Sequence, residues 1–308
     1  MGNGSIIHQG LVLSLGQLGA EFSFTMPFSK WDSNFKKKLS CGDIFLLKKG
    51  DTEVLRGVIT EIPVNGSEYK GYDFAWYLNQ SETIVQFKKI SAKKAIEQLC
   101  KKYDVPYMKL PEMNTQIKKV YKDETIANII ADIIEQHEDE TDKNYRIEMK
   151  DGKLHIFHTS TAKITPHYYD EYGKKHKCTE TAEITGTKSI ENLRNYIIYA
   201  NKNDKKKGIK AIVKSSKSIK KYGLLSDVTV ADNLTSAKAR QRAKNRLSRL
   251  NKITTEFSVK MMGSIAVRAG RKIEFDKVGI GISGWYKIKS GNVTGYVKGE
   301  YCVTGEEA

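Results

Sequence analysis

The stretch that decides the fold is a hairpin pattern near the start of the chain, which has an echo near its end. Gly42-Asp43-Ile44-Phe45-Leu46 is answered by Arg56-Gly57-Val58-Ile59. Gly270-Arg271-Lys272-Ile273-Glu274-Phe275 is answered by Gly284-Trp285-Tyr286-Lys287-Ile288. In both places a glycine opens an apolar strand, and a second glycine about 15 residues later opens its partner. The echo indicates either one small β unit used twice or two unrelated glycine-bounded hairpins.

Further strand patterns surround the first hairpin. Apolar residues mark strands at Leu11 to Leu15 and at Phe22 to Phe24, and an aromatic-rich strand is expected from Tyr69 to Tyr77. The turn of the hairpin itself is Lys48-Lys49-Gly50-Asp51. Short strands with regular turns favour a small barrel or sandwich. We therefore expect an N-terminal β-barrel domain at residues 1–90.

The residue period changes after Ile90 from that of strands to that of helices. Ser91 is expected to cap a first helix, and a second is expected from about Thr125 to the polar run 135–142. Asp151-Gly152 has the chemistry of a tight turn and predicts a hairpin from Tyr145 to Phe157. The apolar stripes of the two helices are Ala92, Ala95, Ile96, Leu99 and Cys100, and Ile126, Ile129, Ile130, Ile133 and Ile134. We therefore expect an insertion domain at residues 91–188.

The last third of the chain, residues 189–308, is expected to form a second β domain that contains two basic interruptions. A strand centred on Tyr196 to Ile198 precedes a lysine-rich stretch at 202–221, which is interpreted as a mobile loop. A helix is expected from about Ser236 to Asn251, because Ala239, Ala243, Leu247 and Leu250 recur at helical spacing. Strands then complete the chain from Thr254 to Val303.

Composition limits the class of protein. A chain of 308 residues with 39% hydrophobic and 29% charged residues is typical of a soluble protein of about two or three domains. No apolar stretch reaches the roughly 18 residues of a membrane helix, so we expect no membrane insertion. The four cysteines form no C-x-x-C pair and are expected to be reduced.

The net charge of +16 is concentrated in the two basic segments. Residues 202–221 hold nine lysines against one acid, and residues 238–252 hold seven basic residues against none. Charge of this size attracts nucleic acid or anionic surfaces. We predict that a contact with nucleic acid or a partner protein would use six residues of the expected helix: Lys238, Arg240, Arg242, Lys244, Arg246 and Arg249. The alternative is a solvated helix that packs on the core by its Ala and Leu stripe.

Catalytic, metal and cofactor motifs are not predicted. His155 and His158 lie on opposite faces of a strand, and His167, His176 and Cys178 fall in a polar loop. Gly279-Ile280-Gly281-Ile282-Ser283-Gly284 matches G-x-G-x-x-G but precedes a strand, whereas a phosphate site requires a helix N-terminus. We therefore expect no enzyme activity and no cofactor.

In order and spacing, these segments resemble the baseplate hub family of contractile phage tails and R-type tail-like bacteriocins. This group includes the late control protein D type and the hubs of PBSX-like prophages. The resemblance covers nearly the whole chain. It rests on the Gly42 hairpin, Tyr72-Asp73-Phe74-Ala75-Trp76-Tyr77-Leu78-Asn79, Thr125-Ile126, Ser189-Ile190-Glu191-Asn192-Leu193-Arg194-Asn195, Tyr222-Gly223, the basic helix and the Gly270 unit.

The resemblance implies a fold and a role. The fold would be β-rich α+β, with two related small β-barrel domains and helical and mixed α/β insertions between them. Three such chains would make a ring of six barrels that joins the six-fold tail tube above to the three-fold spike and other baseplate proteins below. The chain would be made in the bacterial cytoplasm and become part of the virion or tail-like particle. DNA would enter only as the contents of the channel.

Three hypotheses of function therefore stand. The first is a non-enzymatic trimeric hub. The second is a nucleic-acid-binding protein that uses helix 236–251. The third is a tail-associated peptidoglycan hydrolase, for which the sequence holds no catalytic motif.

Overall fold

The structure is a computed structural model of the chain. It describes residues 8–14, 18–26, 39–49, 51–64, 67–161, 163–201, 208–231, 234–262, 267–278, 282–294 and 298–306. Expectations made for Leu15, Gly50, residues 202–207 and residues 279–281 lie outside these ranges. The described part is a β-rich α+β structure, and the fold class expected from the sequence is confirmed at that level.

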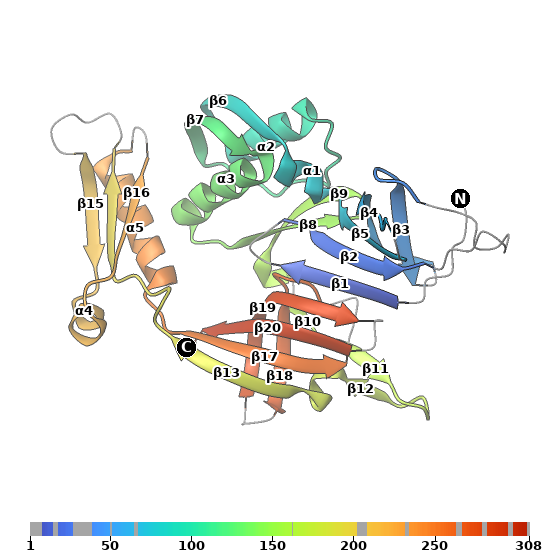
Figure 1. Ribbon diagram of the computed structural model, residues 1–308. Helices are drawn as coiled ribbons and strands as arrows, with labels where there is room; N and C mark the ends of the chain where they lie inside the picture. Colours follow the sequence, from blue (N-terminus) through green and yellow to red (C-terminus); the bar gives the residue numbers. More distant parts are fainter. Residues whose placement is uncertain are drawn as a thin grey trace.

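The two ends of the chain meet in one 11-stranded sheet. β1 (His8–Ser14) pairs antiparallel with β2 (Ala20–Thr25) on one side and with β19 (Ile282–Thr294) on the other. In Figure 1, β1 lies between the blue N-terminal strands and the red C-terminal strands. The remaining strands are β3 (Ile44–Lys49), β4 (Thr52–Glu61), β5 (Glu68–Asp73), β10 (Lys163–Ile164), β13 (Glu183–Ser189), β17 (Thr254–Met262), β18 (Lys272–Val278) and β20 (Lys298–Glu306).

The strand order of this sheet is β13-β17-β20-β19-β1-β2-β5-β4-β3, with β18 and β10 off the path. Among the described strands the path is open, with β13 at one edge and β3 at the other. Because the N-terminal and C-terminal strands share one sheet, the boundary between the two β units runs through the β1–β19 pair. The two separate barrels implied by the resemblance stay a prediction.

The two glycine-opened hairpins share one hydrogen-bonding scheme. The amide of Gly42 donates to the carbonyl oxygen of Ile59 at 2.8 Å, and the amide of Gly270 donates to that of Ile288 at 2.7 Å. The amide of Ile59 donates back to Asp43 at 2.9 Å, as that of Ile288 does to Arg271 at 2.8 Å. Both glycines have a positive φ, +91° and +86°. The two hairpins that resemble each other in sequence therefore also share a backbone hydrogen-bonding pattern.

One apolar core serves both β units. Phe22 stacks on Phe24 and on Phe45, in each case with ring centroids 5.4 Å apart. The same cluster of buried side chains contains Ile273 and Ile288 from the C-terminal strands. Burial of such side chains is worth about 1.5–3 kcal/mol each. The two β units are therefore held together by a common interior as well as by strand pairing.

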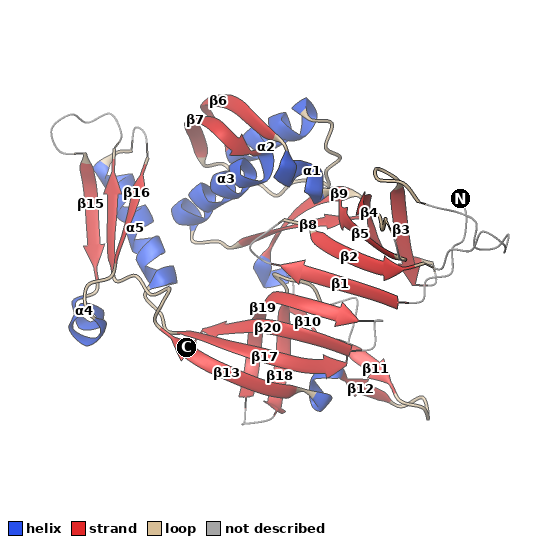
Figure 2. Cartoon of the chain, viewed as in Figure 1, coloured by secondary structure: helices blue, strands red, loops and turns tan. Residues whose placement is uncertain are grey.

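A second apolar core is formed within residues 75–156, and we call this part the insertion domain. The expected boundaries at residues 91 and 188 stay a prediction. α2 (Ala92–Lys102) and α3 (Ile126–Thr141) begin where expected, since Ser91 and Thr125 accept the amides of Lys94 and Asn128. All ten stripe residues named above are buried. Figure 2 shows α1, α2 and α3 grouped beside the strands β6 and β7. The other elements are α1 (Ala75–Gln80), β6 (Glu82–Ser91), β7 (Gln116–Thr125), and the expected hairpin β8 (Tyr145–Lys150) and β9 (Lys153–His158).

The expected strand from Tyr69 to Tyr77 is wrong in its second half. β5 ends at Asp73, and α1 follows. The Asp73 carboxylate accepts the amide of Ala75 at 3.0 Å, which supports the first turn of the helix. Ala75 and Leu78 are both buried, and their spacing of three suits a helix face.

Residues 194–252 form a third unit with a small core of its own. Its sheet has the order β15-β14-β16, and α5 covers one face. The expected loop at 202–221 is wrong for residues 208–221, which form β15 and most of α4, because Ala211 and Val213 face the core of this unit. The elements are β14 (Tyr196–Ala200), β15 (Ile209–Lys214), α4 (Ser216–Tyr222), β16 (Ser226–Val230) and α5 (Ser236–Leu250).

The β8–β9 hairpin lies at a junction between the insertion domain and both β units. Arg268 donates to the carbonyl oxygens of Val54 in β4 and of Met149 in β8. Arg271 pairs with Glu148 of β8 at 3.3 Å. A single turn before β18 therefore ties the hairpin to the first and last thirds of the chain. No helix within the described ranges has the length and apolarity needed to cross a membrane.

Candidate interface on the basic helix

The basic helix α5 forms where the sequence predicts it. The Thr235 hydroxyl accepts the amide of Lys238 at 3.4 Å, which caps the N-terminus. Ala239 and Ala243 are fully buried against Ile197 and Tyr199 of β14. The expectation that the helix packs by its small apolar stripe is therefore confirmed.

The cations of α5 lie partly against α3 and not only in solvent. The guanidinium of Arg242, whose side chain is 6% exposed, binds Glu140 at 2.6 Å. Lys238 binds the same carboxylate at 3.2 Å. Arg246 binds Glu135 of α3 at 2.6 Å and Asp227 of β16 at 2.5 Å. Figure 1 shows α5 on the side of its sheet that faces α3.

Asp139 of α3 is the centre of this charge network. Its side chain is 5% exposed and accepts hydrogen bonds from Tyr199 and Arg249. Arg246 lies 3.5 Å from the same carboxylate, and Asn245 donates to the Asp139 carbonyl oxygen at 2.9 Å. Burial and the Asp139 charge raise the pKa of the Tyr199 phenol, so the hydroxyl remains a donor. The network joins the insertion domain to the third unit.

Two of the six candidate contact residues keep an exposed charge. Within the described part of the chain, Arg240 and Lys244 have no acidic partner, and both are exposed. Lys238, Arg242, Arg246 and Arg249 all pair with acids of α3. Sequence reasoning missed these partners because no local pattern links residues about a hundred positions apart. The contact of α5 with nucleic acid stays a prediction, and its unpaired cations are Arg240 and Lys244.

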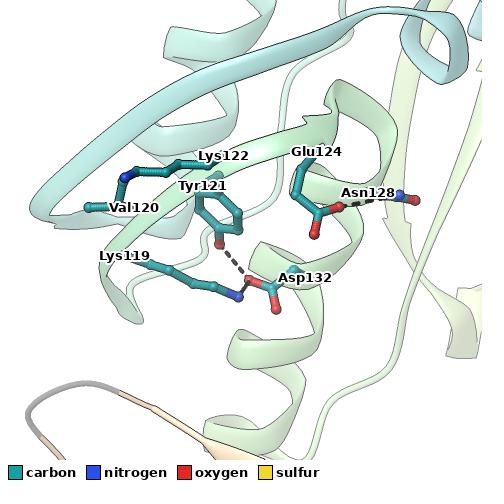
Figure 3. Close-up of a pocket in the computed structure, with 7 residues that line it drawn as sticks. All are labelled: Lys119, Val120, Tyr121, Lys122, Glu124, Asn128 and Asp132. Atoms are coloured by element: carbon teal, nitrogen blue, oxygen red, sulfur yellow. Dashed lines mark hydrogen bonds and ion pairs between the residues drawn. The ribbon is translucent and has the colours of Figure 1, made fainter. Parts of the chain in front are cut away.

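A cavity of about 500 Å³ opens between β7 and α3. Figure 3 shows the Tyr121 phenol and the Lys119 ammonium pointing at Asp132. Asp132 accepts hydrogen bonds from Tyr121 at 2.5 Å and from Gln136 at 2.7 Å, and it pairs with Lys119 at 3.0 Å. Burial and the Asp132 charge raise the pKa of Tyr121, so this phenol is a poor base. The group is satisfied by its own members and offers no activated nucleophile.

The histidines and cysteines form no metal site within the described residues. His176 lies between two carboxylates, Asp170 at 3.0 Å and Glu180 at 3.2 Å. Cys178 is buried, which raises the pKa of its thiol and disfavours the reactive thiolate. Ile282, Ser283 and Gly284 of the G-x-G-x-x-G match lie inside strand β19, which begins earlier than expected, and the described chain after them forms no helix.

The fold is shared with prophage tail proteins. The 43 kDa tail protein of prophage MuSo2 from Shewanella oneidensis aligns with a TM-score of 0.65 at 14% identity, over 98% of this chain and 94% of that one. The tail protein from Neisseria meningitidis MC58 aligns with a TM-score of 0.66 at 12% identity, over 97% and 91%. An Escherichia coli protein, c3393, described as a component of the type VI secretion system, aligns at 0.55 with 9% identity, over 99% and 74%.

Comparison of the sequence with family models assigns the chain to one family. The family model described as YQBQ-like matches residues 14–296, and the chain belongs to this family. A comparison with curated protein sequences gave no significant match.

Proposed function

We propose that the chain is a structural baseplate hub of a contractile tail or tail-like particle. Three copies form a ring that joins the six-fold tail tube to the three-fold spike. The chain has no enzyme activity and acts by assembly, with tube protein on one side and spike or other baseplate proteins on the other.

The repeated hairpin carries this proposal. Two backbone units with the same hydrogen-bonding scheme, opened by Gly42 and Gly270, lie in one sheet of one chain. Three-fold closure of a chain that contains two equivalent units yields six equivalent positions. A ring of three such chains therefore matches a six-fold ring on one face, although its own symmetry is three-fold.

The shared fold supports the same role. The proteins aligned above are named as tail proteins or as a secretion-system component, and the alignments cover nearly all of this chain. In the proposed ring the two β units surround the channel. The insertion domain and the third unit then lie outside it, where they are free to meet other proteins. DNA is present only as the contents of the channel.

The position of the chain in a particle tests this proposal. Particles assembled with a chain that carries an epitope at one terminus are purified from the producing bacterium and labelled with gold-conjugated antibody. We expect gold at the distal end of the sheathed tail, where tube and spike meet. Gold along the sheath, at the head, or only on free protein would contradict a hub.

A further inference from the structure

In β16 two polar side chains face the protein interior and the two apolar side chains face solvent. Asp227 and Thr229 are partly buried on the α5 side, where Asp227 pairs with Arg246. Val228 and Val230 point the other way and are 57% and 56% exposed. A sheet with one solvated face normally puts apolar residues inward and polar residues outward. This strand reverses that rule.

The exposed valines continue a row of aliphatic residues across the three strands. Ile198 of β14 is directly opposite Ile212 of β15 and Val228 of β16 in the strand register, so all three share a face. Ile212 is 41% exposed. A register shift between Tyr199 and Ala200 sets Ile209 opposite Ala200, whose other neighbour is Val230. Ile209 and Val230 are 53% and 56% exposed. We call the surface formed by Ile198, Ala200, Ile209, Ile212, Val228 and Val230 the outer sheet face.

The opposite face of the same sheet is an example of how an apolar face of this sheet is covered. There, Ile197 and Tyr199 are covered by α5 through its stripe of alanines. Three strands spaced about 4.8 Å apart are about 10 Å wide, which is the diameter of one helix. A second helix on the outer sheet face would complete a helix–sheet–helix sandwich, the usual way to bury both faces of a sheet.

Charge defines the chemistry of that helix. Residues 194–252 include 17 basic side chains and three acids, Asp204, Asp227 and Asp232. Six of the basic side chains belong to α5, which covers the opposite face of the sheet. Asp227 is already occupied by Arg246 on the α5 side. Lys214, opposite Tyr196 in the register, lies on the outer sheet face and is exposed. An occupant with carboxylates beside an apolar stripe complements this surface. Tyr196 is an aromatic side chain on this face, but its neighbours Ile198, Ile212 and Val228 are aliphatic and give successive bases no row of aromatic rings to stack on.

We propose that the outer sheet face is a docking site for an acidic amphipathic helix of a partner protein. The leucine or isoleucine stripe of that helix packs on Ile198, Ile212 and Val228. Its flanking carboxylates face the lysines around the sheet. This site is independent of the ring proposed above, because it needs neither a trimer nor a tail tube.

The test measures binding of the full chain to three fluorescent probes by anisotropy. The first probe is a helical peptide of leucine and glutamate with one apolar stripe. The second is a glutamate-only peptide of equal charge, and the third is a single-stranded oligonucleotide of equal charge. We expect the first probe to bind at least about tenfold more tightly than either of the others, because it alone buries aliphatic surface.

Matched variants locate the site. Ile212→Ser and Val228→Ser are both at exposed positions, so we expect the fold to persist while affinity for the first probe falls about tenfold. Ile84→Ser is the control, because Ile84 is 65% exposed on β6 and lies outside this sheet. We expect no change in affinity for this variant.

Any one of the following results would overturn the proposal. These are absence of binding to the first probe, equal affinity for the glutamate-only peptide, tighter binding of the oligonucleotide, or equal loss in the Ile84→Ser control. A dimer in sedimentation that Ile212→Ser abolishes would also overturn the proposal, because a second copy of the chain would then cover the outer sheet face. Failure of the trimeric ring alone would leave the peptide result unchanged, so the two proposals fail separately.

Discussion

Gly42 and Gly270 make the same backbone hydrogen bond at the start of two corresponding strands, but their surroundings differ. A Cβ added at Gly42 would meet no heavy atom within 4 Å. One added at Gly270 would lie 1.9 Å from Nε of Arg146. Arg146 also donates to the carbonyl oxygen of Ala269 at 3.3 Å. The glycine of the second hairpin thus lies against a side chain of the insertion domain, while Gly42 of the first hairpin has open space beside it.

The two glycines therefore predict unequal effects of one substitution. Gly42→Ala should cost about 1–2 kcal/mol, because a Cβ is disfavoured at positive φ. Gly270→Ala should cost about 1–3 kcal/mol more, since Arg146 must also move. Urea denaturation of the two variants measures the difference in the free energy of unfolding. Equal losses would show that Arg146 does not fill the space beside Gly270.

The charge network around Asp139 predicts a second pair of variants. Asp139→Asn leaves the Arg249 guanidinium without its buried counter-charge, while Arg246 keeps Glu135 and Asp227, and we expect a loss of about 3–5 kcal/mol. Glu135→Gln removes an ion pair whose carboxylate is 52% exposed, and should cost no more than about 1 kcal/mol. Chemical denaturation separates these outcomes. A mild effect of Asp139→Asn would mean that the helices α3 and α5 do not depend on this carboxylate.

Asp73 predicts how stability changes with pH. Its side chain is buried and accepts the amides of Ala20 and Ala75, and desolvation raises its pKa from 3.8 to about 7. Between these values the folded chain holds a proton that the unfolded chain has released. The free energy of unfolding should therefore fall by about 3–4 kcal/mol from this group as pH rises from 4 to 7.

Asp73→Asn isolates this contribution. Other carboxylates, such as Glu53 and Glu140, have lowered pKa values and give slopes of the opposite sign. The difference between the two chains is therefore the relevant quantity. We expect the asparagine variant to lack the loss of stability between pH 4 and 7 that Asp73 causes. Parallel stability curves for the two chains would exclude a proton on folded Asp73.

The exposed cations of α5 give a test of nucleic-acid contact. The double variant Arg240→Glu, Lys244→Glu should change the free energy of unfolding by no more than about 0.5 kcal/mol, because both positions are exposed and unpaired within the described chain. We expect its affinity for duplex DNA to match that of the natural chain. A salt dependence weaker by about two counterions in the variant would support the nucleic-acid hypothesis.

Local patterns predicted the elements that have a clear period and a cap. The helix capped by Thr125 and the hairpin turned by Asp151-Gly152 follow from spacing and turn chemistry. The strand Ile209–Lys214 was missed because its lysines suggested a loop, whereas Ala211 and Val213 supply the alternation that faces α5. The high lysine content of that segment was given more weight than its alternating apolar residues.

The site was predictable only in part, since its partners come from distant segments. The apolar stripe of α5 is visible in the sequence, but the pairing of Arg242 with Glu140 depends on how α3 is placed. The joining of β1 to β19 is likewise a long-range pairing that no local signal marks. Charge counted along the chain therefore overstated the charge that α5 offers to a nucleic acid.

The most direct test of the proposed hub is its symmetry. The purified chain at high concentration, alone and co-expressed with tube protein, is imaged by electron microscopy while light scattering measures its mass. We expect rings with three-fold mass and six density lobes, one for each copy of the repeated unit. A compact monomer that forms no ring in either preparation would contradict it.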